Sequence, residues 1–364
     1  MHLWNYADLW DAPPKERAVT LGEGGTPLIR SRRIGESLGL DQLWFKYEGS
    51  NPTGSYKDRF AAAAVTHLAI EGKRVCLGTS SGNTGAAVAA YCARAEIPCF
   101  LAIVEGAPEG KLRQMRAYGA QLFRLKAFGS SPTVNTEVME GLGVLARELN
   151  AGYEISAYTF SPRGMAGVQT LGYELADAFR GVPFHVFSPA GGGGLTLAVG
   201  RGLATQAPQA HLHCVQPAGN DTIASPLRAG HPTATAVTSA TAISGLQVGG
   251  VLDGNHVIEV CRRSGGQGYV VEDEQVWAWQ ARMAREEGIF SEPAGAVALA
   301  GVADAVRRGE LPRDEPVVCL VTGSGFKDER SLLRMTGEAG TPLLSGFGEF
   351  SSAVRQALAQ RSER

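Results

Sequence analysis

The chain has 364 residues, a length that predicts two domains at roughly 150 residues per domain. Hydrophobic residues make up 44% and charged residues 19%, with a formal net charge of -2, which argues against a disordered chain and against a basic surface for nucleic acid. No run of about 18 uncharged apolar residues occurs, and the opening sequence lacks the pattern of a signal peptide. We therefore expect a cytoplasmic protein without nucleic-acid or membrane partners.

Apolar runs of strand length alternate with helical patterns along the chain. The first series is LWFKYEG, RVCLGTS, CFLAIV and QLFRLK, and the second is HVFSPA, HLHCVQPAG, GYVVEDE and VVCLVTG. A helical pattern follows most of these runs. This alternation predicts parallel sheets with helices on both faces, in which ligands bind where a strand ends and a helix begins.

A single lysine marks the first candidate segment, EGSNPTGSYKDR at residues 48–59. Lys57 follows a turn of glycine, proline and asparagine and lies in the first turn of an alanine-rich helix. Because a cation opposes the positive end of the helix dipole, this position lowers the pKa of the amine and favours a Schiff base with a carbonyl cofactor. The alternative interpretation is a solvated surface lysine.

Polar side chains crowd the start of the next predicted helix, in GTSSGNTGAAVAAY. The hydroxyls of Ser80, Ser81 and Thr84 lie there with the amide of Asn83, although capping a helix needs only one such residue. A helix N-terminus presents free N–H groups, so the segment predicts a site for a carboxylate. Asn83 is also suited to donate to a phenolate-like oxygen.

Four consecutive glycines, Gly191, Gly192, Gly193 and Gly194, separate a strand from a helix in FSPAGGGGLTLAV. Backbone without side chains lets N–H groups converge on a phosphate. The segment does not match the dinucleotide pattern, because Thr196 stands where G-x-G-x-x-G has its last glycine, and it lacks the Gly-Lys-Ser/Thr of a P-loop. It therefore predicts another kind of phosphate site and disfavours a nucleotide-dependent oxidoreductase.

The last candidate segment is VVCLVTGSGFKDE, in which a buried strand delivers Thr322 into a glycine-flanked turn. A hydroxyl at this point can hydrogen-bond a ring nitrogen. The six cysteines include no C-x-x-C pair and are typical of buried, reduced thiols, so we expect no metal site.

Taken together and in this order, these segments resemble the fold-type-II pyridoxal-phosphate enzymes, and among them the threonine synthases most closely. The resemblance is carried by LWNYADLWDAPPKERAVTLGEGGTPLIRS, NPTGSYKDR, SSGNTGAA, EEGIFSEPAGA and VTGSGFKD, and it extends to about Asp328. It implies an α/β fold like that of the tryptophan synthase β subunit. Two open, twisted, mostly parallel sheets flanked by helices would hold pyridoxal 5'-phosphate in the cleft between two domains.

The resemblance also implies a discontinuous division of the chain. Residues 58–158 would form a smaller α/β domain with the SSGNTG loop, and residues 18–57 plus 159–342 a larger cofactor-binding domain. Residues 343–364 are expected to be a polar C-terminal tail. We also expect a homodimer.

A role for each candidate residue near the cofactor follows from the same resemblance. Lys57 would carry the cofactor as a Schiff base and, once released, take the substrate α-proton. Asn83 would contact the 3′ oxygen of the cofactor, the four glycines its phosphate, and Thr322 its pyridine nitrogen. For Glu292, near the start of a helix, two roles stay open, lining the site or favouring the helix dipole, and we expect mainly the second.

The substrate carboxylate is assigned by the resemblance to Ser80, Ser81 and Thr84. Threonine synthases bind the phosphate of phosphohomoserine with an Asn-Ser-x-Asn-Pro-x-Arg type of segment. The corresponding stretch here, Tyr158 to Gly164, lacks the Asn-Ser pair and has its arginine shifted by one position. Arg163 remains the candidate for binding a substrate phosphate.

The implied activity is that of a lyase of amino-acid biosynthesis, converting O-phosphohomoserine to threonine and phosphate. Because the phosphate segment departs from the pattern, and GGGGL resembles the loop of threonine dehydratases and serine racemases, two alternatives stay open. These are a β-eliminating threonine or serine dehydratase and a β-replacement synthase for a specialised amino acid. A catalytically silent amino-acid-binding protein is disfavoured by the retained lysine and the complete set of cofactor residues.

Overall fold

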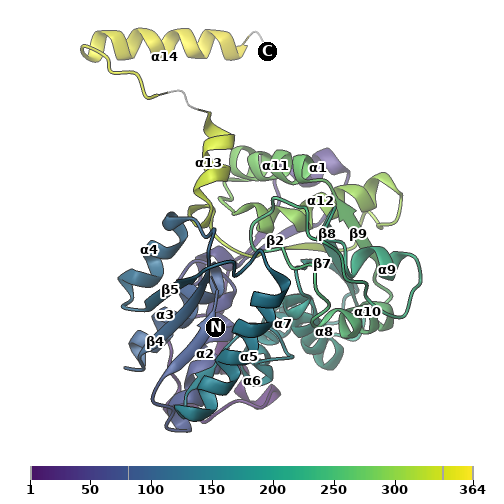
Figure 1. Cartoon of the computed structure of the whole chain (residues 1–364). Coiled ribbons are helices and arrows are strands. Elements are labelled where there is room, and N and C mark those ends of the chain that lie inside the picture. The colour runs from purple at the N-terminus through teal and green to yellow at the C-terminus, as the bar shows by residue number, and fades with distance from the viewer. Residues whose placement is uncertain (1, 81, 338–339, 363–364) are drawn as a thin grey trace.

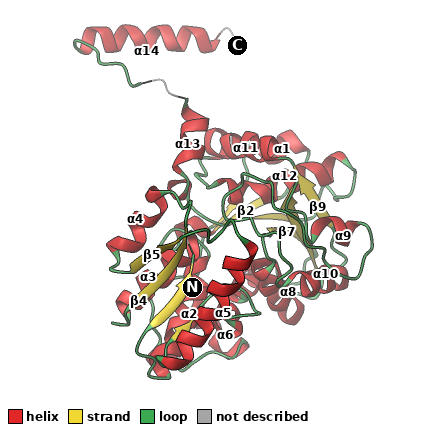
Figure 2. Cartoon of the chain, viewed as in Figure 1, coloured by secondary structure: helices red, strands yellow, loops and turns green. Residues whose placement is uncertain are grey.

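In the computed structural model, which describes residues 2–80, 82–337 and 340–362, the chain forms two sheets with helices around each (Figures 1 and 2). The larger, six-stranded sheet has the order β1 (Leu28–Arg30), β2 (Leu43–Tyr47), β10 (Val317–Val321), β7 (Phe184–Pro189), β8 (Ala210–Pro217) and β9 (Gly268–Val271). The four-stranded sheet has the order β5 (Gln121–Leu125), β4 (Cys99–Val104), β3 (Cys76–Thr79) and β6 (Gly152–Tyr153). Within the described strands, β1 and β2 pair antiparallel and the other pairs are parallel, which confirms the expected fold class.

The helices divide between the two sheets. Those with the larger sheet are α1 (Ile34–Leu38), α7 (Thr170–Ala178), α8 (Gly194–Gln206), α9 (Ala224–Arg228), α10 (Gly254–Arg263), α11 (Asp273–Arg282), α12 (Pro293–Arg307) and α13 (Glu329–Thr336). Those with the smaller sheet are α3 (Asn83–Arg94), α4 (Glu109–Ala117) and α5 (Pro132–Glu148). Short helical turns are η1 (Leu3–Leu9), η2 (Lys15–Arg17), η3 (Glu48–Ser50), η5 (Gly325–Lys327) and the π-helical η4 (Met283–Glu287).

The larger sheet is buried on both faces. Side chains of a strand alternate between the two faces, and β10 sends Val318 and Leu320 into one apolar core and Val317, Cys319 and Val321 into the other. Helix α12 covers the second of these faces, while α8 and α10 cover the first. This two-sided burial explains why the strand reads as a continuous apolar run in the sequence.

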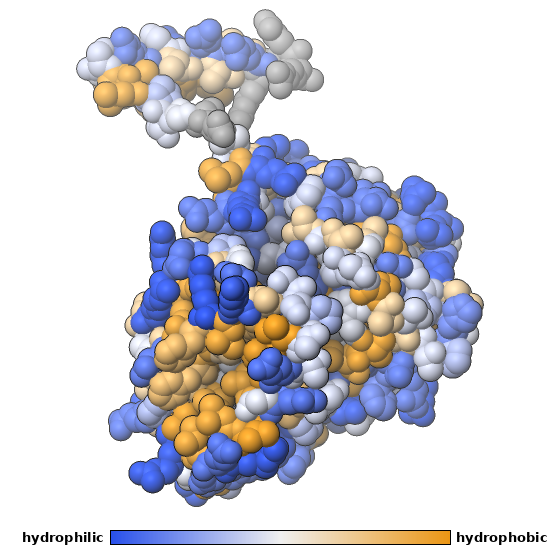
Figure 3. All heavy atoms as spheres, in the orientation of Figure 1, coloured by the Kyte–Doolittle hydropathy of each residue, from blue (hydrophilic) through white to orange (hydrophobic). Residues whose placement is uncertain are grey.

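The smaller sheet is covered less evenly. Leu101 of β4 faces the core shared with α3 and α4, whereas Leu77 of β3 packs on the opposite face against Ala146 of α5. Beyond α5 that face is open, and Phe123 of β5 is 53% exposed while its ring stacks on Phe100. Figure 3 shows apolar side chains gathered over this half of the molecule.

Helix α2 (Lys57–Ile70) lies between the two halves, packed against α3 on one side and α6 (Pro162–Val168) on the other. Its alanines allow the close approach, and a Cβ added to Gly167 of α6 would lie 2.6 Å from the carbonyl oxygen of Arg59. The segment ahead of α2 is fastened to the end of β10, because Tyr56 N donates to Thr322 O at 3.0 Å. The fold therefore sets Lys57, the first residue of α2, at the carboxyl end of the larger sheet.

The C-terminal segment forms α14 (Phe347–Ser362), which stands away from the rest of the molecule in Figure 1. Its Phe347 is 80% exposed. The strands of the smaller sheet fall inside residues 58–158 and those of the larger sheet outside them, while the domain boundaries themselves stay a prediction. Among the helices of the described part, none is long and apolar enough to cross a bilayer.

Candidate active site

The amine of Lys57 lies in a partly buried polar cluster. Its Nζ donates to Ser156 Oγ at 2.6 Å and lies 4.6 Å from the centre of the Tyr56 ring. Burial lowers the pKa of Lys57 to about 8, and the carboxylates of Glu292 and Asp253 offset only part of that shift. About a tenth of this amine is therefore neutral and nucleophilic at pH 7, far more than for a lysine with its ordinary pKa.

Ser156 connects the lysine to the smaller half of the molecule. Its Oγ lies 2.9 Å from Thr84 Oγ1, in addition to accepting from Lys57. Since Thr84 belongs to the first turn of α3 and Ser156 follows β6, the three side chains form a continuous polar row. The structure thus brings the predicted lysine and one predicted substrate hydroxyl together through a residue that the sequence did not single out.

Ser80 and Thr84, which were predicted to bind a carboxylate, lie in the loop ahead of α3 and in its first turn. Ser80 Oγ accepts from Gly82 N at 3.2 Å, and the helix begins at Asn83 without a side-chain cap. The first N–H groups of an uncapped helix are free to bind an anion. Ser81, also predicted there, lies outside the described residues.

Glu292 joins two residues that were predicted to contact the cofactor. Asn83 Nδ2 donates to its two carboxylate oxygens at 2.9 and 3.1 Å, and Thr322 Oγ1 donates to Oε1 at 3.0 Å. Burial raises the pKa of Glu292, while the two donors act in the opposite direction. Glu292 is the N-cap residue of α12, as the dipole reading expected, and its buried carboxylate also lies between Asn83 and Thr322.

The four glycines form a cradle at the start of α8. Gly193 has φ +98°, and a Cβ added there would lie 2.8 Å from Val257, while one added to Gly192 would lie 2.9 Å from Leu252. Leu197 N is the first N–H of the helix with a backbone acceptor, Gly193 O, among the described residues. The preceding N–H groups and the missing side chains fit a phosphate held by backbone.

Asp253 braces this cradle from the side. Its N donates to Gly192 O at 3.1 Å, and its carboxylate accepts from Tyr158 N at 2.9 Å and Thr159 N at 3.2 Å. A Cβ on Gly194 would lie 3.3 Å from its Oδ2. Tyr158 and Thr159 begin the stretch that was compared with the phosphate segment of threonine synthases. Through Asp253, these two residues are connected to the glycine loop.

Comparison with known proteins agrees with this geometry. The model of the family described as pyridoxal-phosphate dependent enzyme matches residues 19–323. The chain belongs to this family. The residues present fit the cofactor, since a partly buried amine, a glycine cradle and a neutral hydroxyl, Thr322, are the groups that such a cofactor needs.

Curated relatives extend over most of the chain. The chain is 32% identical over 347 residues to a threonine synthase of Methanosarcina acetivorans, covering 92% of this chain and 82% of the relative. It is 35% identical over 327 residues to a threonine synthase of Mycobacterium leprae, with 87% and 85% covered. This pyridoxal-phosphate-dependent enzyme is a lyase that performs elimination or replacement on an amino-acid substrate.

A solved structure supports the fold. The processed form of threonine deaminase isoform 2 from Solanum lycopersicum superimposes with a TM-score of 0.74 at 24% identity, covering 93% of this chain and 94% of that chain. At this level of identity the likeness establishes the fold of the pyridoxal-phosphate enzymes of this type and nothing finer.

Arg163 is not part of the cluster around Lys57. Its guanidinium pairs with Glu71 at 2.5 Å, and its side chain is 53% exposed. Glu71 follows the last residue of α2, a helix of 14 residues that begins at Lys57, so the two ends lie about 20 Å apart. The guanidinium therefore lies at the far end of α2 from Lys57, and the structure does not bring Arg163 to the lysine cluster as predicted.

Behind the lysine, a buried ion network fixes the start of α2. Arg59 donates through Nε to Glu48 Oε2 at 2.8 Å and through Nη1 to Glu174 Oε1 at 2.6 Å. Lys46 Nζ also lies 2.5 Å from Glu174. All four side chains are at least nine-tenths buried, so each charge depends on the others for compensation.

Three thiols meet elsewhere in the core. Cys76 of β3, Cys92 of α3 and Cys99 of β4 are buried and free, and their Sγ atoms lie within 4.8 Å of one another. No sequence motif indicated this meeting, because the residues come from three separate elements. Three thiols are suitable ligands for a soft metal ion, although the sequence has no C-x-x-C spacing that would indicate such a site.

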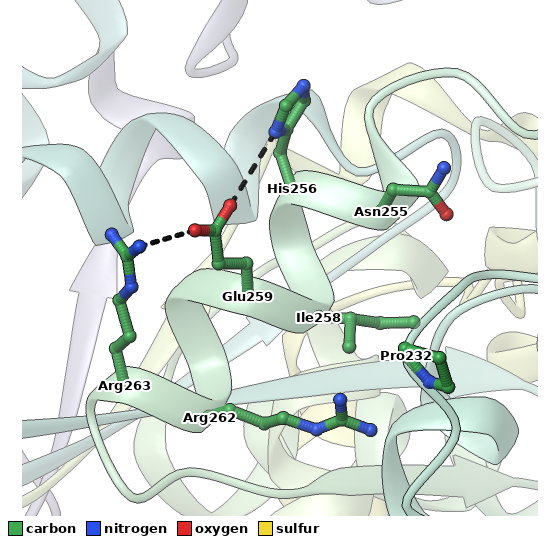
Figure 4. A pocket seen from close by; sticks show the side chains of 7 residues that line it. All are labelled: Pro232, Asn255, His256, Ile258, Glu259, Arg262 and Arg263. Carbon is green, nitrogen blue, oxygen red and sulfur yellow. Dashed lines mark ion pairs between the residues drawn. The ribbon is translucent and has the colours of Figure 1, made fainter.

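A surface hollow of about 420 Å³ lies over α10 and shares no residue with the lysine cluster. Figure 4 shows Glu259 on α10 between Arg263 and His256, with which it pairs. These exposed ion pairs are typical of a solvated helix face. The hollow contributes nothing to the chemistry at Lys57.

Proposed function

We propose that this lyase is of the threonine synthase type and converts O-phosphohomoserine and water to threonine and inorganic phosphate. The observation that carries the proposal is the sustained identity to threonine synthases, 32 to 35% over 87 to 92% of the chain. The cluster around Lys57 supplies residues suited to the proton transfers that such a reaction needs.

The lysine is the central group of the proposed reaction. When bound, the cofactor supplies a sink for the electrons left at the substrate α-carbon. Lys57 Nζ, once free, removes the α-proton, and its depressed pKa lets it accept and return protons near neutral pH. Ser156 Oγ orients this amine through the 2.6 Å hydrogen bond.

The remaining residues of the site would bind the substrate and the cofactor and orient them. Ser80, Thr84 and the free N–H groups of α3 would bind the substrate carboxylate. Thr322 would present a neutral hydroxyl to the pyridine nitrogen, which favours elimination and replacement over transamination. The glycine cradle would hold the cofactor phosphate with backbone N–H groups.

A second activity stays in consideration because of one observation. Arg163 points to Glu71 and away from the lysine cluster, which removes the side chain that the sequence offered for a substrate phosphate. A dehydratase or β-replacement synthase needs the carboxylate site and a small side-chain pocket, without a phosphate site.

A substrate panel tests the proposal. The holoenzyme is incubated with O-phosphohomoserine, threonine, serine, O-acetylserine and O-phosphoserine, and products are identified by mass spectrometry. Threonine formed from O-phosphohomoserine with release of phosphate supports it. Efficient turnover of a β-substituted or β-hydroxy amino acid, with no threonine from O-phosphohomoserine, overturns it and leaves the cofactor assignment intact.

A further inference from the structure

Two lysines beyond the lysine cluster lie where the two halves of the molecule meet. Lys111 belongs to α4 of the smaller half, and Lys327 is the last residue of η5 in the larger half. Lys111 Nζ donates to Ser244 Oγ and lies 3.4 Å from Asp328 Oδ2. Lys327 Nζ donates to Gln114 Oε1 at 2.6 Å. Both ammonium groups thus reach across the boundary between the two halves.

Lys327 is a charged group with a neutral partner. Among the described residues no carboxylate lies within 4.0 Å of its Nζ, and its one side-chain acceptor is the amide oxygen of Gln114. A Cβ added to Gly54 would lie 3.1 Å from its Cε, so the side chain runs over the turn that leads to Lys57. An ammonium held in a partly buried place by an amide is incompletely compensated, and an anionic ligand would complete it.

Both lysines act on the same carboxylate of the site. Their positive charges favour the ionised form of Glu292, which is the residue between Asn83 and Thr322. Burial in turn lowers the pKa of Lys327, with Glu292 and Asp58 opposing that shift. The geometry agrees for Lys327, because Gly54, over which its side chain runs, lies beside Gly323: a Cβ added to Gly323 would lie 3.2 Å from Gly54 O and 2.6 Å from Glu292 Oε1.

The nearby carboxylates are already engaged. Asp58 accepts from Thr53 N at 2.9 Å and Thr53 Oγ1 at 2.7 Å. Asp328 accepts from Ser331 N at 3.0 Å as the cap of α13. Asp328 also lies 3.4 Å from Lys111 Nζ, and neither aspartate forms an ion pair with Lys327 among the described residues.

We propose that Lys111 and Lys327 form the subsite for an anionic group at the end of the substrate side chain, a phosphate in the reaction proposed above. This inference rests on the proposed function and assigns to these residues the role that Arg163 does not fill. A lysine pair suits a phosphate, because each ammonium offers three donors to its oxygens. The subsite would select amino acids with an anion at the γ position over neutral ones of the same length.

The competing explanation is that the two lysines only hold the two halves of the molecule together. In that case their removal would change the affinity for every ligand alike, whereas removal of a subsite would change the affinity for anionic ligands alone. Two ligands of equal chain length separate these cases: 2-amino-5-phosphonopentanoate, an isostere of O-phosphohomoserine in which a methylene replaces the ester oxygen, and norvaline, which lacks the phosphonate.

The experiment measures the dissociation constants of both ligands for the holoenzyme from the change in cofactor absorbance. We expect the wild-type enzyme to prefer the phosphonate by more than tenfold. Lys111→Met and Lys327→Met should each lower affinity for the phosphonate by about ten- to hundredfold, the effect of losing a charge-assisted hydrogen bond. Their affinity for norvaline should change by less than about threefold, by the same reasoning.

Matched variants keep the test decisive. Lys73→Met removes an exposed lysine that is bonded to Asn150, and Arg163→Met removes the arginine paired with Glu71, so both should keep the wild-type preference. Lys327→Arg retains the charge and should recover most of the preference if Lys327→Met folds poorly.

Three results would overturn the subsite: no preference in the wild-type enzyme, an unchanged preference in both methionine variants, or equal losses for both ligands. The measurement needs no turnover. If the substrate panel yields no threonine while the phosphonate preference depends on the two lysines, the proposed reaction fails and the anion subsite stands.

Discussion

Asn83 Nδ2 donates to both carboxylate oxygens of Glu292, at 2.9 and 3.1 Å, and so ties the start of α3 to the residue ahead of α12. An amide NH₂ has two hydrogens to donate. If Asn83 is to donate to the 3′ oxygen of the cofactor, at least one of these bonds has to be exchanged. We therefore expect the partners of this pair to change when the cofactor binds.

Replacing Glu292 by alanine tests this exchange. Glu292→Ala leaves the amide of Asn83 and the hydroxyl of Thr322 without their buried acceptor, which costs about 1 to 3 kcal/mol of folding stability in the apoprotein. The holoenzyme should lose less, because the cofactor offers both groups new partners. Urea denaturation with and without cofactor measures the two losses, and equal losses would contradict the exchange.

The attachment of the cofactor to Lys57 is a second prediction. Purified protein should be yellow, and borohydride reduction followed by peptide mapping should place the pyridoxyl group on Lys57. Lys57→Ala should bind the cofactor without forming the adduct. Lys46, which is engaged by Glu174, serves as an internal control and should stay unmodified. An adduct on any other lysine contradicts the assignment.

The capture of cofactor by apoprotein should depend on pH with a midpoint near that of the buried amine. Burial lowers the pKa of Lys57 to about 8, so the neutral, reactive fraction grows as the pH rises through this value and then levels off. Stopped-flow absorbance from pH 6 to 10 records the rate. A rate that keeps rising about tenfold per unit to pH 10 would indicate an amine with the ordinary pKa of a lysine.

The glycine cradle is tested with two variants of nearly equal size. Gly192→Asn and Gly192→Asp both place a Cβ against the flexible side chain of Leu252. The aspartate adds a negative charge beside a phosphate, which costs about 1 to 4 kcal/mol at contact distance. We expect cofactor affinity to fall at least tenfold further in the aspartate variant than in the asparagine variant. Equal affinities in two folded variants would reject the cradle.

Arg59 is expected to dominate the stability of the turn that carries the lysine. Arg59→Met leaves Glu48 and Glu174 as buried carboxylates with less compensation, so unfolding free energy should fall by about 3 to 5 kcal/mol. Arg180→Met, which removes an exposed partner of Asp177, should cost about 0 to 1 kcal/mol. Denaturant titration of both holoenzymes compares them, and similar losses would show that the buried network contributes little.

The sequence predicted the strands of this fold where local pattern was sufficient. The run VVCLV at 317–321 is apolar throughout because both faces of the larger sheet are covered, and it forms a strand, as does most of the run HVFSPA at 185–190. Strands β1 and β6 were not predicted. They have 3 and 2 residues, which are too few to show the alternation of apolar and polar side chains that marks a strand. The helix α14 was also missed, since its sequence looked polar and weakly patterned.

Within the site, residues that carry their own local signal were found, and residues that act through distant partners were not. Lys57 and the glycine run stand out in the sequence, whereas Ser156 gains meaning only beside Lys57, 99 positions away. Arg163 was misjudged for a related reason. A motif fixes the order of residues along the chain, but the pairing with Glu71 is decided by how α6 lies against α2.

The burial of all six cysteines has a practical consequence for measuring the distance between the two halves. Thiol reagents should find little to attack in the native protein, so a cysteine introduced at the surface would be labelled selectively. Glu140 on α5 and Arg307 on α12 are exposed and belong to opposite halves. A fluorophore pair placed at these two positions would report the distance between the sheets in solution as cofactor and substrate bind, without removing any native residue from the core.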